Sequence, residues 1–428
     1  MSSTPRRQFL TAASAAFTTN LFANKFQGAN DKITAAFIGT GRMGLTNIAN
    51  AKRQENLVIA AVCDVYEPNL AKGAQAAGEG VKTYRDFREI LADKSIDVVC
   101  ISTPDHWHAY QTVEACKAGK DVYVEKPISV TIDEGQKMVA AARKYKRVVQ
   151  AGTMQRSAVH FQKAVEIVKS GVLGTITFVR CWNAGLQPQE GIGNPPDTDP
   201  PKELDWDMWL GPAPKRPFNP NRFGVDPKAF SHFRWFWDYA GGMMTDWGVH
   251  WLDIVQMAFN EAMPTAAVAL GGKFWLKDNR ETPDIIQVTY EYPGFLATYE
   301  NRTGHSQVIH GAGSGILFQG TQATLFVDRS RYAIIPERNS SVAAEEVKAT
   351  DSGNARHWAN FLECVRTRNR PISDIEVCHK STSTCHLGNI ALRSRLRVDF
   401  DPTREFVIQP EARKYVAREY RKPWKLTV

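Results

Sequence analysis

The segment GGMMTDWGVHWLD, residues 241–253, places three polar side chains in a run of apolar and small residues. Asp246, His250 and Asp253 are spaced by four and then three residues, which puts them on one face of a predicted helix. A neutral imidazole near pH 7 can act as a general base, and a carboxylate one turn away can orient the ring or hold a substrate. The segment therefore indicates proton transfer, with His250 as the base and Asp246 as its partner.

Two other interpretations of the same segment stay open. Asp246 can belong to a cap network at the helix N-terminus, with His250 as a satisfied core histidine. The pattern DxxxHxxD, helped by His232 or His108, can instead bind a divalent cation through carboxylate and imidazole. Because the histidines lack the spacing of a zinc site, we expect no metal.

A second candidate site is GTGRMG, residues 39–44, which follows a predicted buried strand and opens a predicted helix. Gly39 allows a tight turn, Gly41 lets the backbone approach a pyrophosphate, and Gly44 allows close packing of helix on strand. Free N–H groups at the helix start favour phosphates. This context predicts a dinucleotide site that includes Arg42 and Met43, and a glycine turn in a plain α/β protein is the alternative.

Asp64 ends the second predicted strand, twenty residues after Gly44. There it can accept hydrogen bonds from a ribose 2′-hydroxyl, and its charge would disfavour a 2′-phosphate. The run that follows, DVYEPN, has no basic residue directly after Asp64. The sequence therefore favours NAD, with NADP as the alternative, unless Asp64 is only a helix cap.

Two further motifs, STPDHWH at 102–108 and VEKPIS at 124–129, follow predicted parallel strands, at the edge where open α/β sheets bind ligands. The residues expected to line the cofactor pocket there are Thr103, Pro104, His108 and Glu125. Lys126, beside a nicotinamide, can donate a hydrogen bond to a substrate hydroxyl and stabilise alkoxide character as hydride leaves. Taken alone, Lys126 is better interpreted as half of a surface lysine–glutamate pair, and His108 can merely cap the next helix.

The elements that must position these motifs are strands alternating with helices. Five apolar stretches predict strands: ITAAFIG, NLVIAAVCD, IDVVCIST, KDVYVEKP and KRVVQAG. Helical patterns lie between them, which predicts a parallel sheet with crossover helices. We therefore expect an α/β protein whose N-terminal Rossmann dinucleotide-binding domain covers residues 31–152.

The pattern changes after residue 152. A helix and a strand lead into a long connection over 182–240 that is rich in Pro, Gly and aromatic residues. A helix over 243–259, several β-rich segments and two late helices follow, which predicts a C-terminal α/β domain over 153–428 with a large, mainly antiparallel sheet. The last helices and tail, 354–428, can pack back on the Rossmann domain.

Some aromatic and imidazole groups of this second region are substrate candidates. The tryptophans of the long connection are Trp206, Trp209, Trp235 and Trp237. They can stack on the C–H faces of a sugar, although packing of the connection itself is the stronger expectation for each one. We keep Trp237 as a candidate for substrate binding. His160 can reach the substrate from an early position in its helix, or pack in the core.

Composition excludes several classes of protein. The chain has 428 residues, 43% hydrophobic and 23% charged, and its excess of eight positive charges is spread along the sequence. We see no basic stripe or module for nucleic acid, and no run long enough to span a membrane. The seven cysteines include no CxxC pair and several lie in apolar runs, so we expect buried thiols and no disulfide framework.

The N-terminus departs from this ordinary composition. Residues 3–23 pair Arg6–Arg7 with Phe9–Leu10 and then a mildly apolar stretch rich in Ala and Thr. This order is similar to a twin-arginine export signal, so residues 1–30 are predicted to be a signal or N-terminal arm that engages the twin-arginine export machinery. The expected location is the periplasm, or the cytoplasm if the signal does not function. An export route for folded protein suits an enzyme that loads its cofactor before export.

With these motifs in view, the chain resembles the glucose–fructose oxidoreductase / inositol dehydrogenase / MocA (Gfo/Idh/MocA) family from about Ile33 to its C-terminus. The resemblance rests on GTGRMG, TPDHWHA, VEKP and GGMMTDWGVHWLD. It implies a Rossmann domain joined to an α/β domain whose open sheet often forms an oligomer interface, hence a homodimer or homotetramer. It also implies that Lys126 is the catalytic lysine, with Asp246 and His250 as the Asp and His of the second domain.

The activity implied is hydride transfer between NAD(P) and a carbinol of a sugar, cyclitol or glycoside. Because the periplasm has no free nicotinamide pool, export favours a tightly bound cofactor. A glycosidase that uses NAD transiently, by oxidation and elimination, is the second hypothesis. A non-catalytic nucleotide-binding sensor is the third, and the intact Lys126 and His250 argue against it.

Overall fold

The computed structural model describes residues 31–224 and 232–428, so the predicted twin-arginine segment lies outside the described residues. The N-terminal region forms a six-stranded sheet in the order β3-β2-β1-β4-β5-β6, with every pair parallel. Its strands are β1 (Ile33–Ile38), β2 (Leu57–Cys63), β3 (Lys82–Tyr84), β4 (Val98–Ile101), β5 (Asp121–Val124) and β6 (Val149–Ala151). Its helices are α1 (Arg42–Ala51), α2 (Glu67–Ala77), α3 (Phe87–Ala92), α4 (Asp105–Lys117) and α5 (Ile132–Lys144). The predicted Rossmann fold is confirmed, but β3 and α3 were not predicted.

The register of this sheet brings the predicted motifs together. Ile38, the last residue of β1, lies opposite Cys63 of β2 and Ile101 of β4, and Ile101 lies opposite Val124 of β5. The four strands therefore end level with one another. Because they are parallel, the segments that follow them emerge at one edge, where the glycine turn, Asp64, STPDHWH and VEKP meet.

The second domain is built on an eleven-stranded sheet in the order β15-β14-β13-β12-β7-β10-β9-β8-β16-β17, with β11 paired to β7 beside this path. Every pairing is antiparallel except that of β7 with β10. Its strands are β7 (Ile176–Leu186), β8 (Ala266–Gly272), β9 (Ile285–Tyr292), β10 (Phe295–Arg302), β11 (Gly304–His305), β12 (Ser314–Gly320), β13 (Ala323–Val327), β14 (Arg331–Pro336), β15 (Glu345–Lys348), β16 (Val398–Asp401) and β17 (Phe406–Val407). The mainly antiparallel sheet is as predicted.

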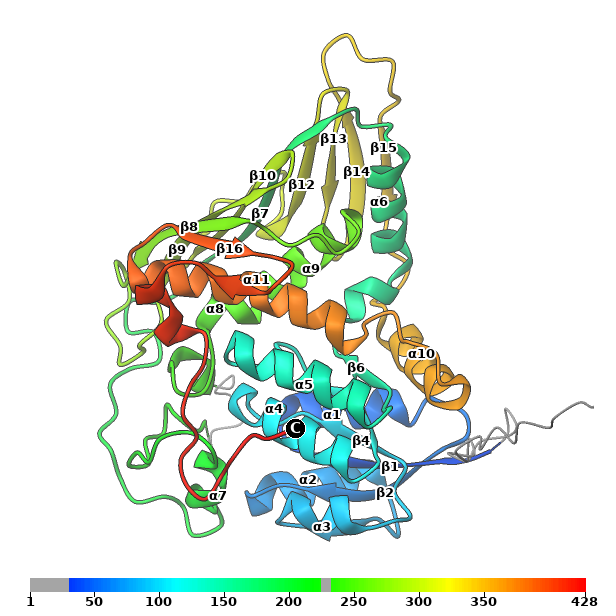
Figure 1. The fold of residues 1–428 in the computed structure, drawn as a ribbon, viewed down its shortest axis with the longest axis vertical. Coiled ribbons are helices and arrows are strands. Elements are labelled where there is room, and N and C mark those ends of the chain that lie inside the picture. Colours follow the sequence, from blue (N-terminus) through cyan, green and yellow to red (C-terminus); the bar gives the residue numbers. More distant parts are fainter. Residues whose placement is uncertain (1–30, 225–231) are drawn as a thin grey trace, which may run out of the picture.

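Helices cover one face of this sheet and separate it from the Rossmann domain (Figure 1). The helices of the second region are α6 (Val159–Ser170), α7 (Trp206–Leu210), α8 (Gly242–Asp246), α9 (Gly248–Ala258), α10 (Asn354–Thr367) and α11 (Ile375–Ser394), with 3₁₀ turns η1 (Met154–Ser157), η2 (His232–Trp235) and η3 (Pro410–Tyr415). The largest hydrophobic core lies between the sheet and α6, α9 and α11.

The two sheets differ as their sequences predict. β1 is buried at five of six positions, as expected for a parallel strand covered on both faces, whereas β9 alternates buried and more exposed residues.

The helix predicted over 243–259 is wrong in one respect. The chain breaks at Trp247 into α8 and α9, so the polar residues of GGMMTDWGVHWLD do not share one continuous helix.

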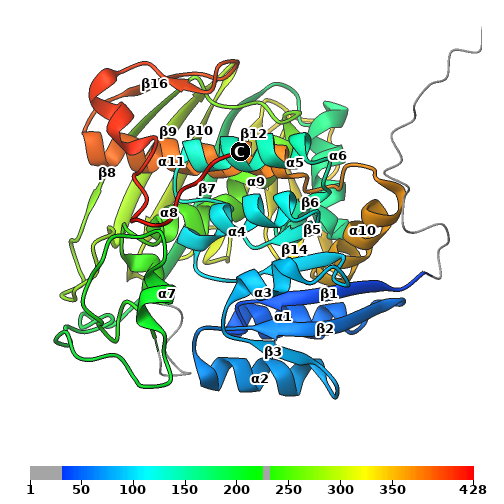
Figure 2. The same cartoon turned by 60° about the horizontal axis from the view of Figure 1, so that its bottom comes forward.

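The long connection and the tail lie beside the Rossmann domain (Figure 2). The connection carries α7 and packs around its own aromatic cluster, which includes Trp209, Phe218 and Tyr239. The tail crosses α4 and α5, where the Arg418 guanidinium pairs with Glu134 at 2.7 Å and Tyr420 donates to the same carboxylate at 2.7 Å. These contacts join the tail to α5, two segments that are distant in sequence.

All seven cysteines are free and buried, as the sequence predicted. Across residues 31–224 and 232–428 we find no helix that is both long and apolar enough to cross a bilayer.

Candidate active site

The three glycines of the turn have different surroundings. Gly41 borders open space that a ligand could occupy, whereas Gly39 and Gly44 lie close to backbone atoms. A Cβ on Gly39, whose φ is +84°, would lie 2.8 Å from the backbone of Thr103, and one on Gly44 would lie 2.0 Å from the Gly39 carbonyl oxygen. A Cβ on Gly41 would meet nothing nearer than Asn69 Nδ2 at 3.8 Å. Gly39 and Gly44 thus permit the turn to pack, while Gly41 borders a space of the kind a pyrophosphate occupies.

A cavity of about 570 Å³ begins at this turn and follows the carboxyl ends of β1, β2, β4 and β5. Every residue that we predicted for the cofactor lines this cavity except Gly44, which packs against Gly39. The shape and lining therefore fit a dinucleotide, with phosphates at the N-terminus of α1 and a nicotinamide at the Lys126 end.

The Asp64 carboxylate is fixed by the backbone around it. It accepts hydrogen bonds from Thr40 N at 2.8 Å and from Tyr66 N at 2.9 Å. Burial raises its pKa, and these two N–H groups oppose that rise. Arg85 and Lys72 line the same cavity, and the Arg85 guanidinium donates to Val65 O at 3.2 Å. This end therefore presents a carboxylate for ribose hydroxyls and cations that a 2′-phosphate could also meet.

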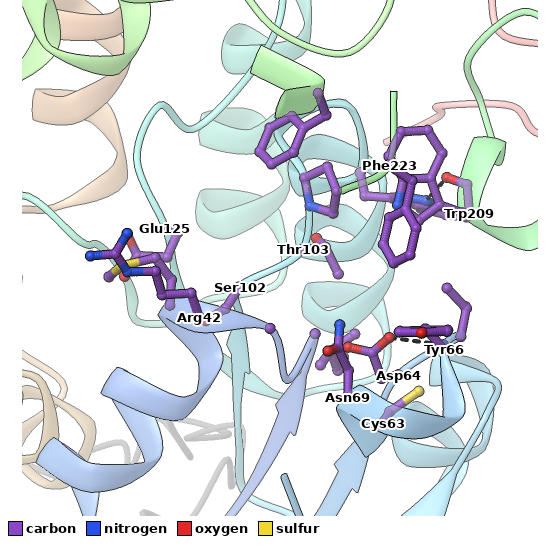
Figure 3. A pocket seen from close by; sticks show the side chains of 18 of the residues that line it. Arg42, Cys63, Asp64, Tyr66, Asn69, Ser102, Thr103, Glu125, Trp209 and Phe223 are labelled. Carbon is purple, nitrogen blue, oxygen red and sulfur yellow. Dashed lines mark hydrogen bonds between the residues drawn. The ribbon is translucent and has the colours of Figure 1, made fainter. Parts of the chain in front are cut away.

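The long connection supplies the opposite wall of the cavity. Figure 3 shows Trp209 and Phe223 facing Asp64, Tyr66 and Asn69 across the pocket. The Tyr66 and Phe223 rings meet edge to face, with centroids 5.3 Å apart. Aromatic side chains are thus placed where a Rossmann domain alone would leave the adenosine side of the cofactor exposed.

Backbone contacts hold this wall on the Rossmann domain. Asp205 N donates to Val65 O at 3.0 Å, and Glu67 N donates to Glu203 O at 3.1 Å. The connection therefore pairs with the segment directly after Asp64. The Trp209 carbonyl also accepts hydrogen bonds from His106 Nε2 and Trp107 Nε1, both at 2.9 Å. Two residues of STPDHWH thus serve to anchor the wall, and this role was not visible in the sequence.

At the other end of the cavity, Lys126 meets Asp246 across the two domains. Lys126 Nζ lies 2.8 Å from Asp246 Oδ1 and also donates to the Asp246 carbonyl at 3.1 Å. Arg234 from η2 flanks the same carboxylate, with Nε 3.2 Å from Oδ2. Burial alone would raise the pKa of Asp246, but Arg234 and Lys126 outweigh it and hold the pKa below its ordinary value. Asp246 therefore stays ionised and fixes the lysine.

His250 lies next to this pair but is not hydrogen-bonded to it. Its ring packs 6.0 Å from the Trp247 ring, and Nδ1 is buried with no partner among the described residues. Burial lowers the pKa of His250 well below its ordinary value, and the charges of Lys126 and Arg329 lower it further. The imidazole is thus neutral at physiological pH, as a general base requires. The predicted pairing of Asp246 with His250 is replaced by a pairing of Asp246 with Lys126.

Two more buried carboxyl groups line the cavity near Lys126. Burial raises the pKa of Asp105, the first residue of α4, to about 8, against the opposing effect of Arg234 and Lys126. Burial also raises the pKa of Glu125, whose carboxylate accepts a hydrogen bond from Asn47 Nδ2 at 2.8 Å. Both carboxyl groups are therefore more readily protonated than ordinary carboxyl groups, beside the cations Lys126 and Arg234.

The other sequence candidates have different surroundings. His108 Nδ1 lies 2.7 Å from Pro127 O and Nε2 lies 2.8 Å from Thr103 O, and burial lowers the pKa of His108 to about 4, so the neutral ring donates to one of these two carbonyls. It lines the cavity and fixes the strand ends. Trp237 does not line the cavity, and its ring lies 4.7 Å from the Arg393 guanidinium. The contact of Trp237 with substrate stays a prediction.

Asp253 and His160 also have partners outside the cavity. The Asp253 carboxylate pairs with Arg156 Nε at 2.7 Å and accepts from Ser381 Oγ at 2.6 Å, so it cannot join Asp246 in a metal site. His160 Nε2 donates to Asp328 O at 2.9 Å. Within residues 31–224 and 232–428, no three His, Cys, Asp or Glu side chains converge in an arrangement that could hold a metal ion.

Sequence reasoning missed Arg234 and Asp105 as parts of the site. Arg234 lies in the aromatic connection, where nothing in the local pattern separates it from a surface arginine. Asp105 stands inside STPDHWH, so its position at a strand end could have drawn attention to it, but its burial beside Lys126 depends on the second domain.

Comparison with known proteins agrees with this architecture. The oxidoreductase family of the Gfo/Idh/MocA type matches twice, with its NAD-binding Rossmann fold at residues 33–153 and its C-terminal α/β domain at residues 157–426. The chain therefore belongs to this oxidoreductase family.

Individual relatives are more distant. Inositol 2-dehydrogenase of Salmonella typhimurium is 32% identical over 165 residues, 37% of this chain and 48% of that enzyme. A glycosyl hydrolase family 109 protein of Shewanella baltica is 27% identical over 158 residues, 34% of each chain. The chain thus spans half or less of the length of these curated relatives. The WlbA dehydrogenase of Bordetella pertussis, solved with NADH and UDP-GlcNAcA, has the same fold, with a TM-score of 0.65 and 18% identity over 86% of this chain and 99% of that one.

Proposed function

We propose that this protein is an NAD(P)-dependent oxidoreductase that transfers hydride between a nicotinamide and a carbinol of a sugar, cyclitol or glycoside. The observation that carries the proposal is the ion pair between Lys126 Nζ and Asp246 Oδ1, 2.8 Å apart, in which Lys126 lines the dinucleotide cavity, with the neutral His250 beside the pair. Inositol 2-dehydrogenase, a relative by sequence, supports a polyol as the substrate.

The roles of the side chains follow from their charges. A bound nicotinamide would supply the hydride acceptor. Lys126 donates a hydrogen bond to the substrate hydroxyl, and its charge stabilises negative charge on that oxygen. His250, neutral and with a free ring nitrogen, takes the hydroxyl proton. Asp246 orients Lys126, and Arg234 in turn orients Asp246.

We further propose that the cofactor is NAD, with NADP as the alternative, and that it is held tightly. Asp64 supports NAD, and Arg85 and Lys72 beside it are the reason to keep NADP. The aromatic wall of Trp209 and Phe223 supports slow release because the cofactor would be enclosed between two parts of one chain. Mass spectrometry of nucleotide released from the acid-denatured, full-length protein tests both points: co-purified NAD or NADP identifies the cofactor, and an empty protein would refute tight binding.

We also propose export by the twin-arginine machinery to the periplasm, with the cytoplasm as the alternative, and assembly as a homodimer or homotetramer through the open sheet. The support is the order of Arg6–Arg7 and Phe9–Leu10 for export, and the exposed face of the second sheet, including Val268 and Leu270, for assembly. Cell fractionation of the natural host and light scattering of the purified protein test these points.

A second candidate function is an NAD-dependent glycosidase that works by transient oxidation and elimination. The similarity to a glycosyl hydrolase family 109 protein favours it, and the same Lys126, Asp246 and His250 can serve. The two functions separate in one assay with aryl glycosides. An oxidoreductase accumulates NADH without aryl alcohol, whereas a glycosidase releases aryl alcohol without net NADH. A protein that does neither, with cofactor bound and a panel of sugars and cyclitols supplied, would leave the non-catalytic sensor.

A further inference from the structure

A third cation lies beside the candidate catalytic residues, and the activity proposed above assigns it no role. Arg329 stands in the turn between β13 and β14, far from Lys126 and Asp246 in sequence. Its guanidinium carbon lies 4.7 Å from the centre of the Trp247 ring and 6.0 Å from that of Trp251. Trp247 is the residue after Asp246, and its ring also packs against His250. The second sheet therefore delivers a positive charge to the helix that carries the site.

The position of Arg329 is fixed by groups on both sides of it. Arg329 Nε donates to Gln155 Oε1 at 3.0 Å, and Gln155 Nε2 donates to the His250 carbonyl at 2.9 Å. One amide side chain thus ties the arginine to the backbone of the candidate base. His160 Nε2 donates to Asp328 O at 2.9 Å and holds the preceding residue of the turn. His160, a substrate candidate in the sequence, acts here by placing Arg329.

The charge of Arg329 is not neutralised by the protein. Among the residues described, no carboxylate lies within ion-pair distance of Arg329, and the residue is exposed. The nearby Asp246 is already shared by Lys126 and Arg234. The positive charge of Arg329 contributes to the lowered pKa of His250, which agrees with its closeness to the imidazole. Three cations, Lys126, Arg234 and Arg329, therefore lie near one ionised carboxylate, and the first two also line the cavity.

We propose that Arg329 binds an anionic group of the substrate, so that the substrate is an acidic sugar. With Nε held by Gln155 and one face stacked on Trp247, the two Nη groups remain to receive a carboxylate or phosphate. The reacting carbinol of the same sugar would then lie between Lys126 and His250. The inference rests on the proposed function for the reaction, but the affinity for an acidic sugar can be measured without turnover.

The test compares matched acidic and neutral sugars with the full-length, cofactor-loaded protein. The probes are D-glucuronate, D-galacturonate and D-glucose 6-phosphate, each against the neutral hexose. Only the acidic sugar of each pair can form a charge-assisted hydrogen bond with the fixed guanidinium. We therefore expect kcat/KM to be about 30-fold higher for the acidic sugar than for the neutral hexose. Comparing the uronates with the sugar phosphate shows which anion is recognised, because the two N–H donors of a guanidinium can bind either a carboxylate or a phosphate.

Three variants assign the preference to Arg329. Arg329→Met keeps the aliphatic stem on Trp247 and removes the charge, so the ratio of kcat/KM for the acidic sugar to kcat/KM for the neutral hexose should fall towards one, through a higher KM for the acidic sugar. Arg329→Lys should restore part of it. Arg331→Met is the matched control, because Arg331 lies in the same hairpin but pairs with Glu346 at 3.3 Å. Removing that charge should leave the preference unchanged.

The outcomes separate this inference from the proposed function. Turnover of neutral and acidic sugars with equal kcat/KM would overturn the inference and leave the oxidoreductase standing. Absence of any turnover, with calorimetric binding of D-glucuronate that is lost in Arg329→Met, would support the inference and refute the oxidoreductase. Neither turnover nor binding of any acidic probe would overturn the inference. Equal losses for both sugars in Arg329→Met would do so too, because they would show a structural role.

Discussion

Asp246 and Asp253 lie seven residues apart, and both are buried carboxylates that pair with cations from other parts of the chain. The Asp253 cluster is closed. Arg156 Nε lies 2.7 Å from Asp253, its Nη1 lies 2.7 Å from Glu261, and the Ser381 hydroxyl donates to the remaining oxygen of Asp253. One cation meets two carboxylates, and the side chains have their hydrogen bonds.

The Asp246 cluster is open by comparison. Two cations, Lys126 and Arg234, share one carboxylate, and the neighbouring His250 has a buried Nδ1 with no partner among the described residues. This arrangement borders a large cavity, whereas the Asp253 cluster borders none of the cavities described. A closed network serves the packing of α9 on η1 and α11, while unsatisfied groups beside a cavity indicate a site that a ligand completes. The difference between the two carboxylates lies in their partners.

The largest effect should come from Lys126. We expect Lys126→Met to lower kcat by about 10³-fold or more, because it removes both a hydrogen bond to the substrate oxygen and the charge that stabilises it. Thermal unfolding of the variant should stay close to that of wild type, since Asp246 keeps Arg234. Lys137→Met, which removes a partly exposed lysine paired with Asp133, is the control. Activity within tenfold of wild type would place the chemistry elsewhere and erase the contrast between the clusters.

The closed cluster should respond in the opposite way. Asp253→Asn leaves Arg156 buried with only the half-exposed Glu261 as a counter-charge, so we expect the free energy of unfolding to fall by about 3 kcal/mol. Urea denaturation measures this loss, and kcat per folded molecule should not change. Asp246→Asn is the paired variant, and it should cost less stability because water in the cavity can solvate Lys126 and Arg234. A larger stability loss from Asp246→Asn would contradict the comparison.

The open cluster also predicts a dependence of stability on pH. The native pKa of Asp105 is raised to about 8 by burial, so native Asp105 keeps its proton at pH values where unfolded Asp105, near 4, has lost it. The native state then binds more protons between about pH 4 and 8, and the Asp105 contribution to stability declines as pH rises through this window. At pH 7 this contribution is a cost of about 2 kcal/mol or more, by the size of the shift.

Asp105→Asn tests this dependence directly. The amide cannot ionise, so the variant should be more stable than wild type at pH 8 and about equal to it at pH 4. Denaturant unfolding of both proteins without added cofactor, at several pH values, gives the difference. Asp133→Asn is a suitable control because Asp133 is a partly exposed partner of Lys137. A difference between Asp105→Asn and wild type that does not change with pH would show that Asp105 is ionised in the native protein.

These contrasts also show what the sequence could predict. The glycine turn, Asp64, STPDHWH and VEKP follow strands of one parallel sheet, so their convergence depends only on strand order and register, which local patterns determine well. The spacing of Asp246, His250 and Asp253 predicted only that all three residues share one helical face. Only the distant partners, Lys126 for one and Arg156 for another, separate the functional carboxylate from the structural one.

Other parts of the site were beyond sequence reasoning for a related reason. Arg234, Trp209 and Arg329 come from an irregular connection and from a β-turn of the second sheet. No helical or strand period relates them to the Rossmann motifs. Their place in the site is set by long-range contacts, such as the pairing of Asp205 N with Val65 O. Such contacts are properties of the whole fold.

The smallest of the expected effects concerns the aromatic wall, and it extends the comparison to the other end of the cavity. Phe223 lies against Tyr66 and Trp209, with ring centroids 5.3 Å and 5.8 Å away, and it lines the space beside Asp64. Phe223→Ala should open this wall without disturbing Lys126 or Asp246. Loss of one aromatic contact to a base or ribose should speed release of bound NADH about tenfold, with little change in kcat at saturating cofactor.

Stopped-flow measurement of NADH fluorescence on mixing loaded protein with excess NAD gives the release rate. Trp237→Ala is the matched control, because Trp237 lies in the same connection but packs on Arg393 and does not line the cavity. It should release NADH at the wild-type rate. If both variants release NADH equally fast, the connection retains the cofactor through its overall packing. If only Phe223→Ala does so, the wall itself holds the adenosine, and retention and chemistry are separate functions of the two ends of one cavity.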